Sequence, residues 1–295
     1  MAQPRVLVNL SIPARAGEAV KAGAEGVGLM RAEFLVYQTG RHPMFLLTDP
    51  HPRDLQTILA DGMRTVARAF DPQPVLYRSM DLRSNEVRDL VGGADLEEVE
   101  ENPALGCRGV NRSQRDADVF RAELAALTRV RAEGFPGLHL MLPFVRWPEE
   151  VTWARTLVAE AAEARGAAVP DVWMMAETPA SILRAHEFAP LVDGVSIGSN
   201  DLSQLVLGLD RDNAAFSRQD WDQDPAVVAA LRMAADRYKA LGIPVGICGD
   251  APSRSEALLE TMMDWGLDSI SVSLDRVQAL HEILGRAESR GLAQA

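Results

Sequence analysis

The sequence is poor in several residue types, and each shortage argues against a class of function. It contains only two cysteines, Cys107 and Cys248, which cannot build a disulfide framework and lack the spacing of a zinc site. It also contains only two lysines, Lys21 and Lys239, although Lys and Arg together number 30. Both lysines lie in stretches that we predict as outer helices. Schiff-base chemistry needs a lysine amine in the site, so a lysine-dependent aldolase is disfavoured.

Basic surface and long hydrophobic runs are missing as well. The formal net charge of −12 argues against a nucleic-acid partner, because binding phosphates needs a basic face. No apolar run approaches the roughly 18 residues that suggest a membrane-spanning helix, and the start MAQPRVLVNL lacks the hydrophobic region of a signal peptide. We therefore expect no membrane partner and a cytoplasmic location.

What the sequence does contain is an alternation of short apolar runs with amphipathic helical stretches. This pattern predicts a buried parallel sheet, and 295 residues suit one (β/α)8 TIM barrel, which typically needs about 250. We expect a single barrel domain over residues 1–295, with an insertion near residues 35–72. Nine strands are predicted for eight places, the weakest being CRGV at 107–110. They are residues 5–11, 26–30, 74–81, 107–110, 138–145, 172–178, 194–199, 244–249 and 269–273.

Polar and charged residues stand at the carboxyl ends of these runs, where barrel enzymes carry their chemistry. They include four arginines, several carboxylates, two amides and a thiol. We predict that they share one rim. In chain order they are Asn9, Arg31, Glu33, Arg78, Asp81, Arg108, Arg146, Glu177, Asn200, Asp201, Cys248 and Asp250.

Two carboxylates in this set suggest a metal site. Glu177 ends one apolar run in VWMMAETPAS, and Asp201 ends the next in GVSIGSNDLSQ. Carboxylates on adjacent strand ends can share a hard cation such as Mg²⁺, which takes its remaining ligands from water and substrate oxygens. The alternative is that Glu177 caps the following helix and Asp201 is an ordinary N-cap. For the pair together we favour the metal.

Two arginines in the set suggest an anionic substrate. Arg31 in GLMRAEF and Arg78 in LYRSMDL follow apolar strand residues, where a guanidinium must find an anion. One alternative is a structural salt bridge to Glu33 and Asp81. The other is a forked clamp for phosphate or carboxylate. Several arginines beside a divalent cation point to a small, multiply anionic substrate such as phosphoenolpyruvate.

Cys248 stands between two glycines at the end of the apolar run in VGICGDAP. A thiol beside an enolate can deliver or remove a proton at carbon. The alternative is that Cys248 is a small residue in a tight turn. We expect Cys107, by contrast, to be structural.

Seven segments, in order along the chain, resemble the carboxyl-terminal barrel of the phosphoenolpyruvate-utilising enzymes. This family comprises phosphoenolpyruvate synthase, pyruvate phosphate dikinase and Enzyme I of the sugar phosphotransferase system. The similarity covers about residues 5–285, and MDLRSNE and EENPALGCRG look closest to the synthase branch. The segments are GAEGVGLMRAEFL, YRSMDLRSNE, EENPALGCRG, MLPFVR, MMAETPAS, VDGVSIGSNDLSQLVLGLDRDN and VGICGDAPS.

The resemblance implies roles for the matching positions. Glu177 and Asp201 would hold Mg²⁺, and Cys248 would protonate the methylene carbon of enolpyruvate and act as the base in reverse. Arg31 and Arg78 would act in catalysis as well as binding. The substrate-binding positions implied by the family are Arg31, Arg78, Arg108, Asn200, Arg211 and Asp250.

The sequence departs from the family in two respects. Asp250 stands where several members have glutamate or glutamine. Family enzymes also pass the phosphoryl group through a histidine on a separate domain, and the synthase and dikinase carry a nucleotide-binding domain. None of the five histidines lies in a Thr-Ser-His-Ala type of context, and there is no P-loop. We expect neither domain within residues 1–295.

The resemblance thus implies a barrel that exchanges phosphoryl between phosphoenolpyruvate and a phosphohistidine supplied by another chain or a missing segment. It also implies a homodimer. Two rival functions stay open: a metal-dependent lyase acting through a pyruvate enolate, and a catalytically silent assembly or regulatory barrel.

Overall fold

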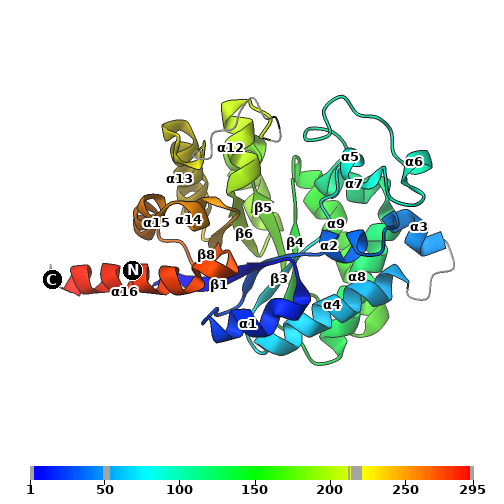
Figure 1. Ribbon diagram of the computed structural model, residues 1–295, viewed down its shortest axis with the longest axis horizontal. Coiled ribbons are helices and arrows are strands. Elements are labelled where there is room, and N and C mark those ends of the chain that lie inside the picture. Colours follow the sequence, from blue (N-terminus) through cyan, green and yellow to red (C-terminus); the bar gives the residue numbers. More distant parts are fainter. Residues whose placement is uncertain (1–2, 49–53, 212, 214–220, 293–295) are drawn as a thin grey trace.

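The chain folds as a closed barrel of parallel strands, with each strand paired to its neighbours in sequence order (Figure 1). The computed structural model describes residues 3–48, 54–211, 213 and 221–292, with side chains up to residue 286. Strand β1 pairs with both β2 and β8, which closes the sheet and confirms the predicted (β/α)8 barrel. The strands are β1 (Arg5–Leu10), β2 (Val27–Arg31), β3 (Val75–Arg78), β4 (Leu138–Leu142), β5 (Val172–Ala176), β6 (Gly194–Gly198), β7 (Val245–Cys248) and β8 (Ser269–Val272).

Helices cover the outside of the barrel, and several short ones lie near its carboxyl-end rim (Figure 1). None of the helices in the described ranges has both the length and the apolar character needed to cross a membrane. The helices are α1 (Ala16–Lys21), α2 (Glu33–Tyr37), α3 (Pro43–Thr48), α4 (Leu55–Phe70), α5 (Ser84–Val87), α6 (Gly93–Leu96), α7 (Gly109–Arg115), α8 (Ala117–Ala132), α9 (Pro148–Arg165), α10 (Pro179–Leu183), α11 (Ala185–Phe188), α12 (Ser199–Leu207), α13 (Pro225–Ala240), α14 (Ala251–Arg254), α15 (Glu256–Met262) and α16 (Val277–Leu292).

The predicted strand CRGV at residues 107–110 is wrong. Arg108 is the N-cap of α7, and Gly109 already begins that helix. Gly109 has a φ of +59°, a left-handed value that an extended strand does not contain. A side chain there would also meet the backbone of Pro143 and the Cβ of Phe144 at 2.6 Å. The glycine is therefore used for a turn packed tightly against the end of β4.

The predicted insertion at residues 35–72 contains a regular barrel helix. Helix α4 packs against α1 and α8 in the outer ring, so it is the expected helix of the second strand–helix unit. Asp54 caps it by accepting a hydrogen bond from the Thr57 amide at 2.6 Å. The additional elements of this unit are α2 and α3, and residues 49–53 lie outside the described chain.

A second excursion, which we call the rim lobe, spans residues 79–116 and carries α5, α6 and α7. A buried ionic cluster ties it to the segment before α3. His42 Nε2 lies 2.8 Å from Glu97 Oε1, and Arg112 Nη1 donates to Glu97 Oε2 at 3.2 Å. All three side chains are buried, so this cluster fixes the lobe beside the barrel rather than leaving it as an extended loop.

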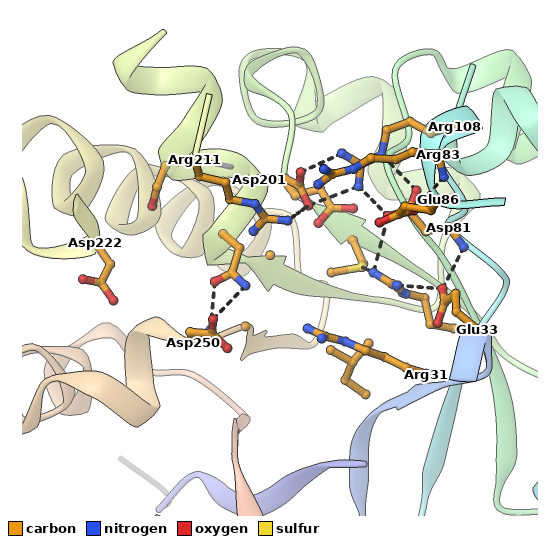
Figure 2. A pocket seen from close by; sticks show the side chains of 18 of the residues that line it. Arg31, Glu33, Asp81, Arg83, Glu86, Arg108, Asp201, Arg211, Asp222 and Asp250 are labelled. Carbon is orange, nitrogen blue, oxygen red and sulfur yellow. Dashed lines mark hydrogen bonds and ion pairs between the residues drawn. The ribbon is translucent and has the colours of Figure 1, made fainter. Parts of the chain in front are cut away.

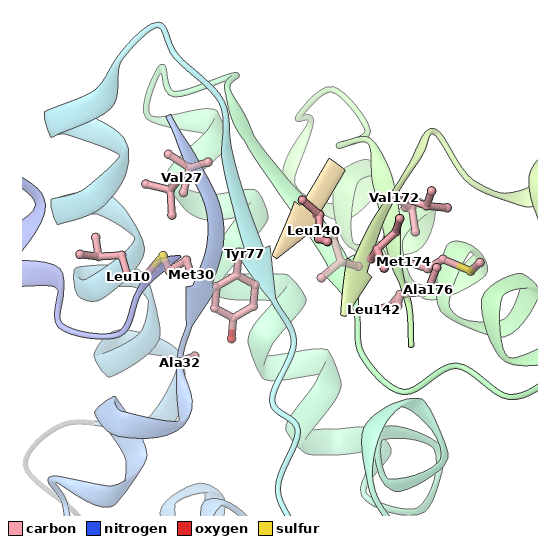
Figure 3. Packing of buried hydrophobic residues seen from close by; sticks show 14 of the residues in the cluster. Leu10, Val27, Met30, Ala32, Tyr77, Leu140, Leu142, Val172, Met174 and Ala176 are labelled. Atoms are coloured by element: carbon pink, nitrogen blue, oxygen red, sulfur yellow. The ribbon is translucent and has the colours of Figure 1, made fainter. Parts of the chain in front are cut away.

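Alternation along the strands separates two layers of packing. Outward-facing residues such as Val27, Tyr77 and Leu140 join the main core between the sheet and the helices (Figure 3). Inward-facing residues form a smaller cluster within the barrel, made of Leu29, Leu76, Met141, Met175 and Cys248. Side chains two residues apart on a strand share a face, so this inner layer determines what lies above it at the rim.

Candidate active site

The polar rim is formed by residues two positions beyond the inner layer, on the same face of each strand. Arg31 stands two residues after Leu29, Arg78 two after Leu76, and Glu177 two after Met175. These groups lie in a cavity of about 650 Å³ at the carboxyl ends of the strands. The predicted site residues that line it are Arg31, Glu33, Arg78, Asp81, Arg108, Glu177, Asn200, Asp201, Arg211 and Asp250.

Arg78 is buried and is held by two carboxylates. Its Nη2 donates to Glu33 Oε1 at 2.7 Å, and its Nη1 lies 3.5 Å from Asp81 Oδ2. Burial disfavours the charge on Arg78, but these carboxylates outweigh it and raise the pKa above its usual range. The salt-bridge alternative considered for Arg78 is therefore present, although its Nε remains buried without a partner.

Arg31 lies beside Arg78, since the two residues are register partners on β2 and β3. Unlike Arg78, it makes no hydrogen bond or ion pair with any residue in the described part of the chain. Its guanidinium extends into the cavity, where Figure 2 shows no interaction reaching it. The salt-bridge alternative is therefore not found for Arg31, whose positive group faces the cavity.

Arg108 connects two carboxylates of the cavity, Asp81 after β3 and Asp201 in α12. Its Nε donates to Asp81 Oδ1 at 3.0 Å, and its Nη1 donates to Asp201 Oδ1 at 2.8 Å (Figure 2). The guanidinium also lies 4.0 Å from the centre of the Phe144 ring. Burial alone would raise the pKa of Asp201, but the positive charges of Arg108 and Arg211 lower it below its ordinary value. Asp201 is thus an ionised carboxylate held in a fixed position.

Glu177 is buried directly after β5 and does not cap the following helix, where Thr178 is the N-cap. Its Oε1 accepts the amide hydrogen of Phe144 at 2.7 Å, and Phe144 has a strained φ of +48°. Burial, together with the negative charge of Asp201, raises the pKa of Glu177 to about 8. A Cβ at Gly198 would lie 2.3 Å from Glu177 Oε2, so the carboxyl occupies space that this glycine leaves open.

Asn200 and Asp250 form a paired contact at the β6–β7 side of the cavity. Asn200 Nδ2 donates to Asp250 Oδ2 at 3.2 Å, and Asn200 Oδ1 accepts the Asp250 amide at 3.0 Å. Arg254 Nη2 donates to the same Asp250 carboxylate at 2.9 Å. Arg211 approaches from the turn that follows α12, with its Nη2 3.9 Å from Asp201 Oδ2. Asp250 therefore orients Asn200.

Cys248 lies in the inner layer and does not line the cavity. It is fully buried, and burial raises the pKa of its thiol to about 11 although a hydrogen bond from Ser196 lowers it. Two other predicted rim residues are also absent from the lining. Asn9 donates to the Gly249 carbonyl at 3.1 Å, and the Arg146 guanidinium donates to the Gly106 carbonyl at 2.7 Å.

Comparison with known proteins gives this arrangement a context. A family model described as the phosphoenolpyruvate-binding domain of phosphoenolpyruvate-utilising enzymes matches residues 1–289. The chain belongs to this family. The resemblance inferred from the sequence segments is thereby confirmed.

Curated relatives of this phosphoenolpyruvate-binding domain are considerably longer. A probable phosphoenolpyruvate synthase of Methanocaldococcus jannaschii is 36% identical over 97% of the chain, which covers 24% of that protein. The phosphoenolpyruvate synthase of Aeropyrum pernix is 38% identical over 97% of the chain, which covers 36% of that protein. The phosphoenolpyruvate synthase of Deinococcus radiodurans is 38% identical over 92% of the chain, which covers 38% of that protein. The chain thus spans roughly a quarter to two fifths of these proteins.

The donor set of this phosphoenolpyruvate-binding domain fits Mg²⁺. Glu177 and Asp201 bring two carboxylates to one cavity, and the described residues contain no group of three or more His, Cys, Asp or Glu arranged as a metal site. Two carboxylates completed by water and substrate oxygens are usual for Mg²⁺. Repulsion from Asp201 contributes to the raised pKa of Glu177, and a divalent cation held by both would offset that repulsion.

The domain also has lining residues that the sequence reasoning missed. Arg83 and Glu86 enter the cavity from the start of α5, inside the segment MDLRSNE that carried part of the resemblance. Their position in that segment was the available signal. Tyr37, Trp221 and Arg254 come from elements around the rim and have no distinguishing pattern in the sequence.

Proposed function

We propose that this barrel binds phosphoenolpyruvate and pyruvate with Mg²⁺ and exchanges a phosphoryl group with a phosphohistidine. The observation that carries the proposal is the Arg31–Arg78 pair. Arg31 directs an unpaired guanidinium into a cavity that also contains the carboxylates Glu177 and Asp201. The Arg31 side chain is partly buried, and its Nε is buried with no hydrogen-bond partner among the described residues. A phosphoryl or carboxylate group of the substrate would supply that partner.

In this proposal each residue acts on a stated part of the substrate. Arg31, Arg78 and Arg211 bind the phosphoryl oxygens, where Arg78 is already held in place by Glu33 and Asp81. The Asn200 amide turns from Asp250 to donate to the same group. Arg108 orients Asp201 and stays bound to it. Glu177 and Asp201 would hold Mg²⁺, which supplies positive charge to substrate oxygens when bound.

In this proposal Cys248, which lies beneath the cavity and next to the lining residue Gly249, acts as the acid at carbon. During transfer the bond between phosphorus and the enol oxygen breaks, and a bond to a histidine nitrogen forms. The electron pair left on enolpyruvate takes the thiol proton at the methylene carbon, which gives pyruvate. A pKa of about 11 keeps this thiol protonated at neutral pH, as a proton donor to carbon requires. The phosphohistidine comes from another chain or from a segment outside this one.

Calorimetric titration of oxalate and phosphoenolpyruvate, with and without Mg²⁺, tests the proposal. Oxalate is a planar dianion that mimics the enolate of pyruvate. We expect Mg²⁺-dependent binding that is lost in Glu177→Gln, a variant that keeps the acceptor for the Phe144 amide. Cys248→Ala should retain this binding but lose the exchange of pyruvate methyl hydrogens with solvent deuterium. No binding by the folded wild type would refute the proposal and favour a silent barrel.

The lyase alternative makes a different prediction. It requires Glu177 and Asp201 but not the arginine pair, so Arg31→Met would keep activity on oxaloacetate without a phosphohistidine partner. The proposed chemistry requires that this variant lose phosphoenolpyruvate binding. The homodimer and the cytoplasmic location expected from the sequence stay predictions, to be checked by sedimentation and by fractionation of cells.

A further inference from the structure

Glu123 is a buried acid outside the cavity that the proposed mechanism does not use. It lies on the outer helix α8, and its side chain is 1% exposed. No ion pair joins it to any cation in the described ranges. Burial raises its pKa to about 8 despite the hydrogen bonds it accepts. An uncompensated buried carboxyl is unfavourable for stability, so what it contacts indicates why it is there.

One oxygen of Glu123 accepts two hydrogen bonds from the same stretch of chain. The hydroxyl of Tyr77, on β3, donates to Glu123 Oε1 at 2.7 Å. The backbone amide of Met80, in the turn that follows β3, donates to the same oxygen at 2.8 Å. Both donors are buried, so each would lose its partner in a place that water does not reach.

The Met80 bond belongs to a series of three. The Ser79 amide donates to the Met141 carbonyl at 3.0 Å, which continues the pairing of β3 with β4. The Met80 amide donates to Glu123, and the next amide, that of Asp81, donates to Glu33 Oε1 at 2.8 Å. Two glutamates therefore hold consecutive amides, Glu123 from the helix layer and Glu33 from the cavity.

This turn determines where the charged groups of the cavity lie. It begins directly after Arg78 and ends at Asp81, which contacts both Arg78 and Arg108. Arg108 in turn holds Asp201. A shift of the turn would therefore reach the arginine pair and one of the two carboxylates together. Glu123 on α8 accepts the Met80 amide hydrogen, so this bond is where the outer helices can hold the turn in place.

We infer that Glu123 is a positioning residue of the cavity, which fixes the turn after β3 and through it Arg78 and Asp81. The effect on ligand binding rests on the proposed function, whereas the effect on the turn does not. Glu123 acts through the hydrogen bonds that it accepts and not through its charge. A neutral acceptor of the same shape should replace it.

The test compares three variants of the full chain. Glu123→Gln keeps an oxygen acceptor, and Glu123→Met removes it while keeping similar volume. Tyr238→Phe is the control, since it deletes another buried hydrogen bond, the one donated to the Ser181 carbonyl at 2.6 Å, on the far side of the cavity. For each variant, hydrogen exchange of a peptide covering residues 79–83 and the oxalate Kd with Mg²⁺ are measured.

For Glu123→Met we expect much faster exchange in residues 79–83 and oxalate binding weaker by about tenfold or more. Glu123→Gln should stay within about twofold of wild type in both, and Tyr238→Phe should change neither. Unchanged exchange and affinity in a folded Glu123→Met would overturn the inference, as would equal losses in the Gln and Met variants. If the Met variant does not fold, faster exchange in residues 79–83 and weaker oxalate binding in a folded Glu123→Gln would still overturn the inference. The two proposals can fail separately. If wild type binds no oxalate but Glu123→Met still exchanges faster in residues 79–83, the proposed function is refuted and the role of Glu123 in the turn is retained.

Discussion

Arg31 and Arg78 are register partners at the carboxyl ends of neighbouring strands, yet among the residues that the structure describes only Arg78 has an ion-pair partner. Both extend from the inner face of the barrel above Leu29 and Leu76. Glu33 and Asp81 lie on the side of Arg78, so their charge compensates one guanidinium and leaves the other facing the cavity. One arginine therefore belongs to the framework of the site, and the other is available to a ligand.

The two arginines should respond differently to the same substitution. Arg31→Met removes no ion pair, so we expect the free energy of unfolding to change by less than about 1 kcal/mol while phosphoenolpyruvate binding is lost. Arg78→Met leaves Glu33 buried without its cation, whereas Asp81 keeps Arg108. Breaking one such buried pair typically costs about 3–5 kcal/mol. Urea denaturation and calorimetry of both variants check this. Equal destabilisation would contradict the assignment of separate roles.

Gly198 provides a way to move Glu177 without changing its chemistry. A Cβ at this position would lie 2.3 Å from Glu177 Oε2, so Gly198→Ala must displace the carboxyl or the strand. We expect Mg²⁺-dependent oxalate binding to weaken by about tenfold or more, with a smaller effect on stability. Gly17→Ala is the matched control, because an added Cβ there meets nothing within 4 Å. Wild-type affinity in Gly198→Ala would show that the carboxyl position is not critical.

The barrel could be predicted from the sequence because each strand and helix has a hydrophobic pattern within its own short stretch of residues. Apolar runs of strand length mark each strand, and amphipathic stretches mark the helices between them. The same pattern predicted most strand ends too far along the chain, although the predicted second strand, residues 26–30, ends one residue before β2 does. Residues 138–145 were predicted as one strand, but β4 ends at Leu142, and Phe144 is buried with a φ of +48°. The hydrophobicity of Phe144 correctly predicts that its side chain is buried, but it does not predict that the backbone turns there.

The charged site could be predicted only in part, for a related reason. Strand-end positions identified the cavity residues Arg31, Arg78, Glu177 and Asp201. They could not reveal which arginine is paired, because Glu33, Asp81 and Arg108 meet only after the chain has closed the barrel and the rim lobe has folded back. The burial of Cys248 beneath the cavity was not predicted either. It follows from its inward register beside Gly198, which pattern alone does not give.

The raised pKa of Glu177 predicts how Mg²⁺ affinity depends on pH. With a pKa of about 8 in the free protein, the carboxyl carries a proton at neutral pH, and Mg²⁺ binding must release it. Affinity should therefore rise about tenfold per pH unit from pH 6 to 7 and level off above pH 8. Calorimetry at pH 7 in buffers of different ionisation enthalpy should detect release of nearly one proton. Binding without proton release would count against Glu177 as a ligand.

Glu123 predicts a pH dependence of stability that can be isolated by one conservative substitution. Its pKa is raised from the ordinary value of 4.5 to about 8, mainly by burial, with Glu33 raising it and Arg78 lowering it. The native state therefore keeps a proton that the unfolded chain releases above about pH 4.5. The stability that Glu123 contributes is complete below that pH and is lost as the pH rises to about 8. Across this window the loss is at most about 5 kcal/mol.

Glu123→Gln cannot titrate, so its stability should lack this component while other groups titrate alike in both proteins. Urea denaturation at pH 5, 6, 7 and 8 should show wild type losing stability relative to the variant at each step, by up to about 1.4 kcal/mol per pH unit. Above pH 8 the difference should be constant. Parallel stability curves would mean that the Glu123 carboxyl ionises in the folded protein as it does in water. Its two hydrogen bonds would then be accepted by a carboxylate, and the turn after β3 would be held by a charge.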